Sequence, residues 1–266
     1  MAGLKAEDGS MAGAQAIRRA MDVVRAVAQF QRSGATLSRI AHATGLSTST
    51  AHRILRSLTE ERMLRHDEPT RSYRLGLLAF EIGLATQAES QVQPYWREAI
   101  EDIARKTRLT TYLMARSDCE AVCLLCEQGT MRIRAMPVEV GQRLPLGIGA
   151  GSLAILATIP EDEVSEVLAA NEQRFRMFPG SAAQAPVILE RVAQSREAGF
   201  AVSSGSVADG LVGVGVPVLP RRGLLQLAIS VSAVADVLDT DEARQIAGVI
   251  AAAIRNRLKQ AQDIAA

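Results

Sequence analysis

The sequence predicts an α+β protein of two domains: a small helical N-terminal domain that ends in a β-hairpin, and a larger domain of mixed helices and strands. Apolar residues recur at helical spacing through the first part of the chain, whereas segments rich in β-branched residues alternate with helical ones in the second. The length of 266 residues, 48% of them hydrophobic and 22% charged, is that of an ordinary globular chain with room for two cores.

Charge divides the chain in the same way. Residues 1–75 hold twelve Lys or Arg against seven Asp or Glu, a net charge of +5, whereas residues 76–266 carry −4. A basic N-terminal part on an acidic body is typical of a protein that binds phosphate groups with its first domain. The sequence has no apolar run of about 18 residues and no signal-peptide pattern, so we expect a cytoplasmic protein without a membrane partner.

The N-terminal segment predicts little structure before its first helix. Residues 1–15 are rich in Ala and Gly with mixed charges, which is typical of a disordered lead-in. An amphipathic helix is then expected to begin near Ile17 and to end near Gly34. Its predicted apolar stripe consists of Ile17, Met21, Val24 and Ala28.

A helix-turn-helix and a hairpin are predicted next, and they complete a winged helix-turn-helix domain over residues 16–75. Thr36 and Ser47 are positioned to cap two short helices, and Gly45 lies in the turn between them. A turn at residues 67–70 separates two short basic segments, which predicts a two-stranded wing. The second helix has i, i+3, i+4 and i+7 spacing on the face expected to be buried, through Ala51, Ile54, Leu55 and Leu58.

The opposite face of that second helix carries hydroxyl and basic side chains, as docking into DNA requires. Hydroxyls at a helix start suit phosphate oxygens, whereas arginines reach base edges or the backbone. Exposed arginines alone would indicate only a solvated surface, but the helix-turn-helix and the basic hairpin together favour DNA contact. The predicted DNA-binding residues are Ser47, Thr48, Ser49, Thr50, His52, Arg53, Arg56, Arg71 and Arg74.

The rest of the chain predicts a connecting helix over residues 76–92 and an α+β sensor-like domain over residues 93–266. A Gly-rich loop over residues 141–151 leads into an apolar helix, and such loops permit close backbone approach to a small anion. Helices are predicted near 94–106, 161–170, 184–198 and 240–259, and strands near 110–116, 121–128, 199–203, 211–218 and 224–232.

The cysteines and histidines argue against a metal site and against nucleophilic catalysis. All three histidines lie before residue 67, far in sequence from the cysteines, so a zinc site has no fourth ligand and a serine or cysteine nucleophile has no base. We therefore predict neither an enzyme nor a cofactor, and reduced thiols in a half-buried strand. The cysteines are Cys119, Cys123 and Cys126, and the histidines are His42, His52 and His66.

Several motifs resemble those of the IclR family of bacterial regulators, from about residue 16 to residue 258. In the N-terminal part the matching segments are 46–55 (LSTSTAHRIL) and 73–76 (YRLG); in the C-terminal part they are 140–146 (VGQRLPL), 196–201 (REAGFA), 215–218 (GVPV) and 228–232 (AISVS). This resemblance implies a winged helix-turn-helix joined by a helix to a GAF-like effector-binding domain. It also implies that the working unit is a homodimer or a dimer of dimers.

The resemblance further implies an effector pocket against the concave face of the second domain's sheet. Without the resemblance, the shared strand face of Ser230 and Ser232 could equally be a pocket floor or the solvent side. Two positions depart from the family pattern: Ser203 stands where members that bind small oxo-acids tend to carry an acidic residue, and Ser152-Leu153 replaces a frequent Gly-Lys. The implied pocket residues are Ile133, Met136, Ala150, Gly151, Ser203, Leu211, Gly213, Ser230 and Ser232.

The expected function is that of a sequence-specific DNA-binding transcriptional regulator, either repressor or activator. Its partners would be a double-stranded operator, a second copy of itself and a small-molecule effector, with a small organic acid or an aromatic metabolite as the expected class. The alternative is a sensor or oligomerisation module without specific DNA binding. That alternative leaves the basic first 75 residues unexplained.

Overall fold

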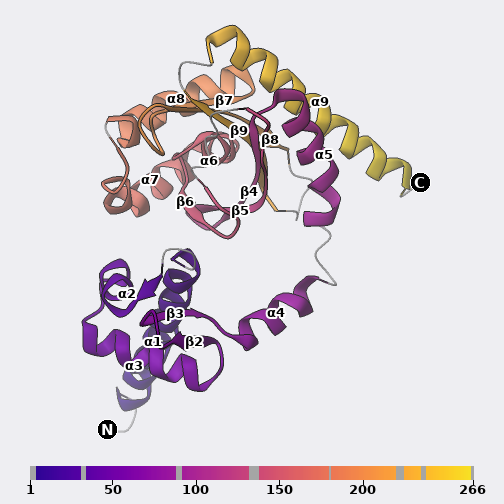
Figure 1. The fold of residues 1–266 in the computed structure, drawn as a ribbon. Helices are drawn as coiled ribbons and strands as arrows, with labels where there is room; N and C mark the ends of the chain where they lie inside the picture. The colour runs from indigo at the N-terminus through magenta and orange to yellow at the C-terminus, as the bar shows by residue number, and fades with distance from the viewer. Residues whose placement is uncertain are drawn as a thin grey trace. The chain divides into compact units, whose positions relative to one another are not determined.

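The chain divides into two units, Met1–Gln91 and Val92–Ala266. The computed structural model describes residues 4–30, 34–87, 92–131, 138–179, 181–219, 225–234 and 238–264. Figure 1 shows the helices and strands of each unit. The fold class predicted from the sequence is confirmed: a helix-turn-helix unit with a small sheet precedes an α+β unit.

Within its described residues, the first unit contains three helices, a three-stranded antiparallel sheet and a fourth helix that follows it. Gly45 ends the second helix in the left-handed conformation (φ 65°), as its place in the turn predicted. Thr36 precedes that helix, although its side chain makes no capping hydrogen bond. The elements are α1 (Leu4–Gln29), β1 (Ala35–Thr36), α2 (Leu37–Thr44), α3 (Thr48–Glu60), β2 (Leu64–Asp67), β3 (Ser72–Leu75) and α4 (Leu77–Gln87).

Helix α1 differs from the prediction in its start and in its buried face. It begins at Leu4 rather than near Ile17, because Ala, Leu, Met and Gln, which favour helices, make up much of the segment predicted to be a disordered lead-in. Residues 1–3 of that segment lie outside the described residues. Ile17 and Met21 of the predicted stripe are 69% and 43% exposed. The residues that pack into the core are instead Val23, Ala26, Val27 and Phe30, a helix face turned away from the predicted stripe.

Strand β1 is the element of the first unit that the sequence did not predict. It pairs with β3 through Ala35↔Tyr73 and Thr36↔Ser72, while β2 pairs with the other edge of β3. Two residues are too few to produce a periodic signal. The central strand of the wing is therefore held from both sides, which fixes it to the helical core through Ala35.

The second unit is built on a six-stranded antiparallel sheet in the order β6-β5-β4-β9-β8-β7. Every predicted helix and strand of this unit is present, with ends that differ by a few residues, and β6 is an additional short edge strand. The strands are β4 (Thr110–Ser117), β5 (Glu120–Glu127), β6 (Arg143–Pro145), β7 (Ala201–Ser204), β8 (Leu211–Val218) and β9 (Leu227–Val234). The helices are α5 (Val92–Thr107), α6 (Ala150–Leu156), α7 (Glu161–Phe175), α8 (Ala185–Ala198) and α9 (Thr240–Ile264).

The two faces of this sheet are covered by different helices (Figure 1). Helices α5 and α9 pack on one face, where Ile229 and Val231 of β9 join their core. Helices α6, α7 and α8 pack on the other face, towards which Ala228 of the same strand points. Alternation along β9 therefore places Ser230 and Ser232 on the α6 side, and both are buried.

Helix α6 lies in direct backbone contact with the sheet, and glycines allow this approach. A Cβ on Gly215 of β8 would come within 2.3 Å of the Ala150 carbonyl oxygen. A Cβ on Gly151 of α6 would come within 2.8 Å of the Ser230 hydroxyl. Since real Cβ atoms do not approach other atoms so closely, a side chain at Gly215 would push the backbone of the helix off the strand, whereas one at Gly151 would displace the side chains of Met114 and Ser230.

We expect Gly215→Ala to lower the free energy of unfolding by about 2 kcal/mol, because the added methyl group overlaps the Ala150 carbonyl and α6 must move. Gly248→Ala is the matched control, since the space around Gly248 in α9 is open. That substitution should be neutral or should stabilise by up to about 1 kcal/mol. Urea unfolding followed by circular dichroism measures both variants. Equal stability of the two would contradict the close approach of α6 to β8.

Candidate functional site

Helix α3 begins with a cluster of hydroxyl groups linked by hydrogen bonds. Ser47 Oγ accepts a hydrogen bond from the backbone N–H of Thr50 at 3.2 Å, which confirms the predicted cap. The Ser47 hydroxyl also lies 2.8 Å from Thr50 Oγ1 and 3.1 Å from Ser49 Oγ. Thr48, in the first turn, is exposed. These hydroxyls surround the positive end of the helix, where a phosphate oxygen is favoured.

The outer face of α3 presents basic side chains, while Ala51 and Leu55 are fully buried on the inner face. His52 and Arg53 are exposed, and Arg53 makes no hydrogen bond or ion pair with any described residue. Arg56 pairs with Glu60 across one turn at 2.9 Å, but its side chain is 75% exposed. Such a surface pair contributes little stability and can exchange for a phosphate or a base.

The two predicted arginines of the hairpin differ in exposure and in their partners. Arg71 is exposed at the turn, with a positive φ of 47°. Arg74 lies back along the strand, with its Nε 3.6 Å from an Asp67 carboxylate oxygen and buried without a hydrogen bond. Arg65, which the sequence analysis did not include, is exposed and lies opposite Arg74 in the strand register. The alternation with buried Leu64 was the signal that could have indicated Arg65.

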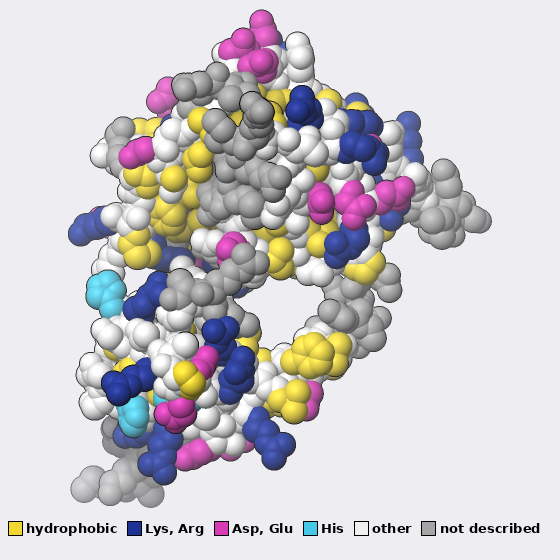
Figure 2. All heavy atoms as spheres, viewed as in Figure 1, with side chains coloured by type: hydrophobic (Ala, Val, Ile, Leu, Met, Phe, Trp, Pro, Cys, Tyr) yellow, Lys and Arg dark blue, Asp and Glu magenta, His cyan; other side chains and the backbone are white. Residues whose placement is uncertain are grey.

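The first unit thus gathers exposed basic and hydroxyl groups on α3 and on the hairpin. Figure 2 shows Lys, Arg and His side chains spread over the visible surface of this unit, which also carries some acidic groups. A surface of this kind can bind the phosphates of a duplex while one helix enters the major groove.

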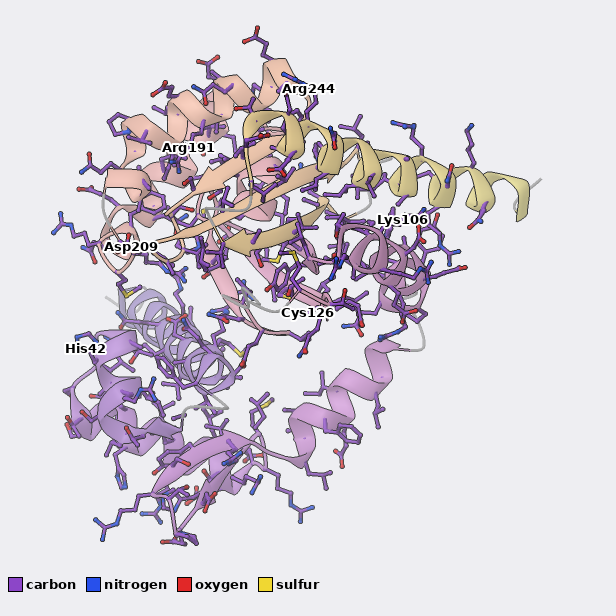
Figure 3. The ribbon with its side chains drawn as sticks, turned by 45° about the horizontal axis from the view of Figure 1, so that its top comes forward. His42, Lys106, Cys126, Arg191, Asp209 and Arg244 are labelled. Carbon is purple, nitrogen blue, oxygen red and sulfur yellow. The ribbon has the colours of Figure 1, made fainter. Side chains whose placement is uncertain are left out.

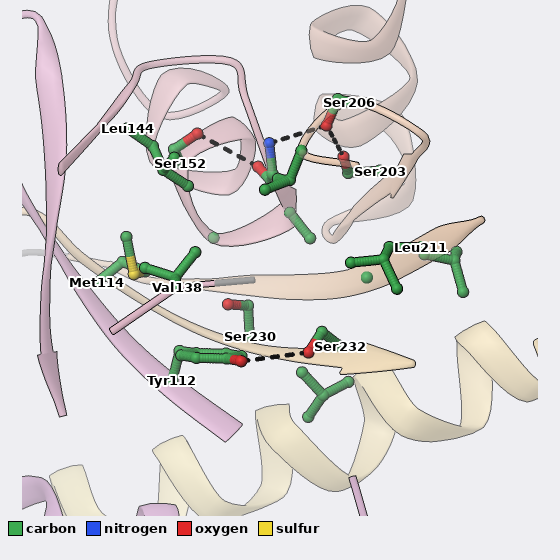
Figure 4. Close-up of a pocket in the computed structure, with 17 residues that line it drawn as sticks. Tyr112, Met114, Val138, Leu144, Ser152, Ser203, Ser206, Leu211, Ser230 and Ser232 are labelled. Atoms are coloured by element: carbon green, nitrogen blue, oxygen red, sulfur yellow. Dashed lines mark hydrogen bonds between the residues drawn. The ribbon is translucent and has the colours of Figure 1, made fainter. Parts of the chain in front are cut away.

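A pocket lies in the second unit between α6, the loops beside it and the strands β4, β8 and β9 (Figure 4). Its cavity of about 50 Å³ has room for roughly four water-sized groups. Ile133 and Met136 fall outside the described residues. The other seven predicted effector residues line the pocket together: Ala150, Gly151, Ser203, Leu211, Gly213, Ser230 and Ser232.

The polar groups of the pocket are hydroxyls and backbone amides. Ser203 and Ser206 share a hydrogen bond of 2.5 Å, and Ser206 Oγ accepts the Gly149 N–H at 3.0 Å. Ser230 Oγ makes no hydrogen bond to any described residue and faces the cavity. No Asp, Glu, Lys, Arg or His occurs among the described residues of the lining. The described part of the pocket therefore holds a ligand through neutral donors and acceptors.

Tyr112 is a pocket residue that the sequence analysis missed. Ser232 donates a hydrogen bond to its phenolic oxygen at 3.4 Å, which ties β4 to β9 at the pocket wall (Figure 4). Burial raises the pKa of Tyr112 well above its ordinary value, so the phenol stays protonated and neutral. The burial pattern of β4, where both faces are covered, gives no sequence signal for which side faces a ligand.

The three cysteines are free thiols in the second unit. Cys123 is buried in β5, and burial raises its pKa to about 12, which keeps it protonated and unreactive near neutral pH. Cys119 and Cys126 are half-buried; Figure 3 labels Cys126. Within the described ranges, no group of three or more His, Cys, Asp or Glu side chains could hold a metal ion. Among the same residues, no helix is long and apolar enough to cross a membrane.

Two family models match the chain. The C-terminal domain of the bacterial transcriptional regulator IclR matches residues 88–256, and the IclR helix-turn-helix domain matches residues 16–68. The chain belongs to the IclR family. The predicted resemblance is therefore confirmed, and the two matches follow the division of the chain into two units.

Curated IclR-family relatives align along most of the chain. The HTH-type transcriptional regulator XynR of Escherichia coli (strain K12) is 25% identical, over 86% of this chain and 89% of its own length. The HTH-type transcriptional repressor AllR of Salmonella typhimurium is 26% identical, over 89% of this chain and 86% of its own length. The chain is accordingly a DNA-binding transcriptional regulator with a C-terminal effector-binding domain, and the alternative without specific DNA binding is not favoured.

Solved structures confirm the fold. An IclR-family transcriptional regulator from Brucella abortus is 23% identical with a TM-score of 0.72, covering 98% of this chain and 96% of that one. An IclR homologue from Microbacterium hydrocarbonoxydans, complexed with 4-hydroxybenzoate, is 20% identical with a TM-score of 0.67, covering 92% and 99%.

Ser47→Ala should destabilise the helix-turn-helix unit by about 1 kcal/mol, because the Thr50 N–H loses its capping partner. Ser57→Ala is the control on the same helix, since Ser57 is exposed in the helix interior, where alanine is the better helix former. Hydrogen exchange of the α3 amides reports the difference. Unchanged exchange in the Ser47 variant would show that the cap contributes nothing to α3.

Proposed function

We propose that α3 is the recognition helix and that Arg53 is its main base-reading side chain. The observation that carries this proposal is that Arg53 is exposed next to the capped start of α3 and has no partner among the described residues. A guanidinium group without a protein partner can form two parallel hydrogen bonds to one guanine. Arg56 can join it by exchanging its ion pair with Glu60.

The other DNA contacts position the helix rather than read the sequence. Phosphate contacts are proposed for the side chains around the start of α3: Ser47, Thr48, Ser49, Thr50 and His52. Arg71 at the hairpin turn would reach the adjacent DNA backbone or the minor groove. Arg65, on the same pair of strands, is proposed as a further DNA contact. Arg74 can contact DNA only if its guanidinium group exchanges Asp67 for a phosphate. In the absence of DNA, its ion pair with Asp67 orients the hairpin.

Self-association is proposed through apolar side chains that the first unit leaves exposed. Four large side chains on α4 are between 47% and 61% exposed: Leu77, Phe80, Ile82 and Leu84. A cluster of this kind on one short helix marks an interface. A homodimer, or a dimer of dimers, would cover it and would present two recognition helices to the half-sites of a partly palindromic operator.

The pocket of the second unit is proposed as the effector site. The free Ser230 hydroxyl, the Ser203–Ser206 pair and the backbone of Ala150 and Gly151 converge on one cavity. The small cavity favours a compact organic acid. An aromatic acid, such as the 4-hydroxybenzoate bound to the M. hydrocarbonoxydans neighbour, would need a larger cavity than the one described. The effector changes operator affinity only to the extent that it binds the two dimer geometries unequally.

We further propose that the protein acts in the cytoplasm and catalyses no reaction. The named relatives are transcriptional regulators, and the buried Cys123 thiol is poorly suited to be a nucleophile because its pKa is raised.

Arg53→Ala should weaken binding to the specific operator by about 1–3 kcal/mol and leave non-specific binding nearly unchanged, because only base contacts are lost. The operator comes from selection on fragmented genomic DNA, and affinities come from mobility shifts across a salt series. Arg105→Ala, an exposed ion-paired arginine of the second unit, is the control. Equal operator affinity of the Arg53 variant and the wild type would remove Arg53 from base reading.

Ser230→Ala should weaken effector binding about fivefold to tenfold, since the pocket loses a neutral hydrogen-bonding group. Calorimetric titration with a series of acids, from glycolate to 4-hydroxybenzoate, identifies the binder, and operator affinity is then measured with and without it. Ser165→Ala, on the exposed face of α7, should change nothing. A bound acid that left operator affinity unaltered would contradict the regulatory part of the proposal.

A further inference from the structure

A second and larger concavity of the C-terminal unit lies away from the serine-lined pocket. It has a volume of about 540 Å³ and lies between the ends of α6 and α8, the second half of β8 and the middle of α9. We call it the α6–α9 groove. It exists because β7 begins at Ala201, opposite Gly215, so the last residues of β8 have no neighbouring strand on that side. Its volume falls within the range of small-molecule sites.

The floor of the α6–α9 groove is apolar and its walls come from both layers of the unit. Ala154 of α6 and Ala157, which follows this helix, line it from one layer, and Ile254 and Leu258 of α9 line it from the other. Phe200 is partly buried beside them. An alkyl chain or another slender apolar group would remove this floor from water.

Two guanidinium groups line the same groove. Arg196 donates from Nε to the Ala157 carbonyl at 3.1 Å and from one terminal nitrogen to the Ile159 carbonyl at 2.7 Å. These bonds fix the side chain and leave its second terminal nitrogen, Nη1, without a partner among the described residues. Arg255 is exposed and likewise has no partner there. Since no Asp or Glu belongs to the described lining, the groove is complementary to an anion.

We propose that the α6–α9 groove is a second ligand site, which takes an amphipathic monocarboxylate such as a medium-chain fatty acid. The carboxylate pairs with Arg196 and Arg255, and the alkyl chain lies on the alanine, isoleucine and leucine floor. The site is distinct from the effector pocket, whose smaller cavity and described lining without charged side chains suit a different ligand.

Helix α6 connects the two sites. Its first residues, Ala150 to Ser152, line the effector pocket, and Ala154 and Ala157 line the groove. Helix α6 has seven residues, all buried, and rests directly on β8, so a displacement of one end by a ligand would be passed to the other end. If the groove ligand displaces α6 in this way, it changes affinity in the pocket, and by linkage a ligand in the pocket changes affinity in the groove by the same factor.

The test is calorimetric titration of the full-length protein with sodium octanoate, below its micellar concentration. We expect one site per chain, with 1-octanol binding at least tenfold more weakly because it lacks the charge. Arg255→Gln should weaken octanoate binding about tenfold. Arg244→Gln is the matched control: Arg244 lies about 16 Å earlier along the same helix, pairs with Asp241 and should leave binding unchanged (Figure 3).

Ser230→Ala separates this proposal from the effector pocket. Octanoate binding that persists in the Ser230 variant and falls in the Arg255 variant supports the groove. If the Ser230 variant loses octanoate, or the Arg255 variant does not, the proposal is wrong. A change of molecular mass by light scattering in the Arg255 variant would also overturn it, because the groove would then be an interface between copies of the chain.

Discussion

The close approach of helix α6 to the sheet is the constraint on which the rest of the C-terminal unit depends. Gly215 on the strand lets the two backbones meet without a side chain between them, and Gly151 on the helix leaves room for the side chains of Met114 and Ser230. The first turn of α6 thereby comes to lie beside Ser230, and the pocket becomes a narrow space instead of a wide cleft. Leu153, Ile155 and Leu156 of the same helix are fully buried, so the contact also anchors the core on that face.

Elements with strong periodicity could be predicted from the sequence, and those decided by tertiary packing could not. Helix α3 has one clear apolar face, of which Ala51 and Leu55 are buried, and strand β8 spans the residues predicted for it. Helix α1 carries two overlapping apolar stripes, and only its contact with α2 and α3 determines that Val23 and Val27 are buried. Strand β1 forms only by pairing with β3, and the paired residues Ala35 and Tyr73 are 38 positions apart in the chain.

The same distinction, between local sequence pattern and tertiary packing, applies to the functional surfaces. The serines of β9 could be assigned to one strand face by alternation, but whether that face was a pocket or the solvent side depended on which helices cover it. Tyr112 joins the pocket through Ser232, a partner 120 residues away, which no local pattern can indicate. On the DNA-binding side, the hydroxyls and arginines of α3 follow from helical geometry. The pairing of Arg74 with Asp67 depends on the wing's strand register.

The placement of the aromatic residues gives this protein a built-in optical reporter. The chain has one tryptophan, Trp96, which is buried in α5 and stacked edge-on against Tyr95 at 5.1 Å between ring centroids. Of the other two tyrosines, Tyr73 belongs to the wing sheet and Tyr112 to the pocket wall. Fluorescence excited at the red edge of the absorption band, where tryptophan absorbs and tyrosine does not, therefore comes from Trp96 in the C-terminal unit alone. Unfolding of the C-terminal unit can therefore be followed by the emission of Trp96 in the intact chain, without an added label.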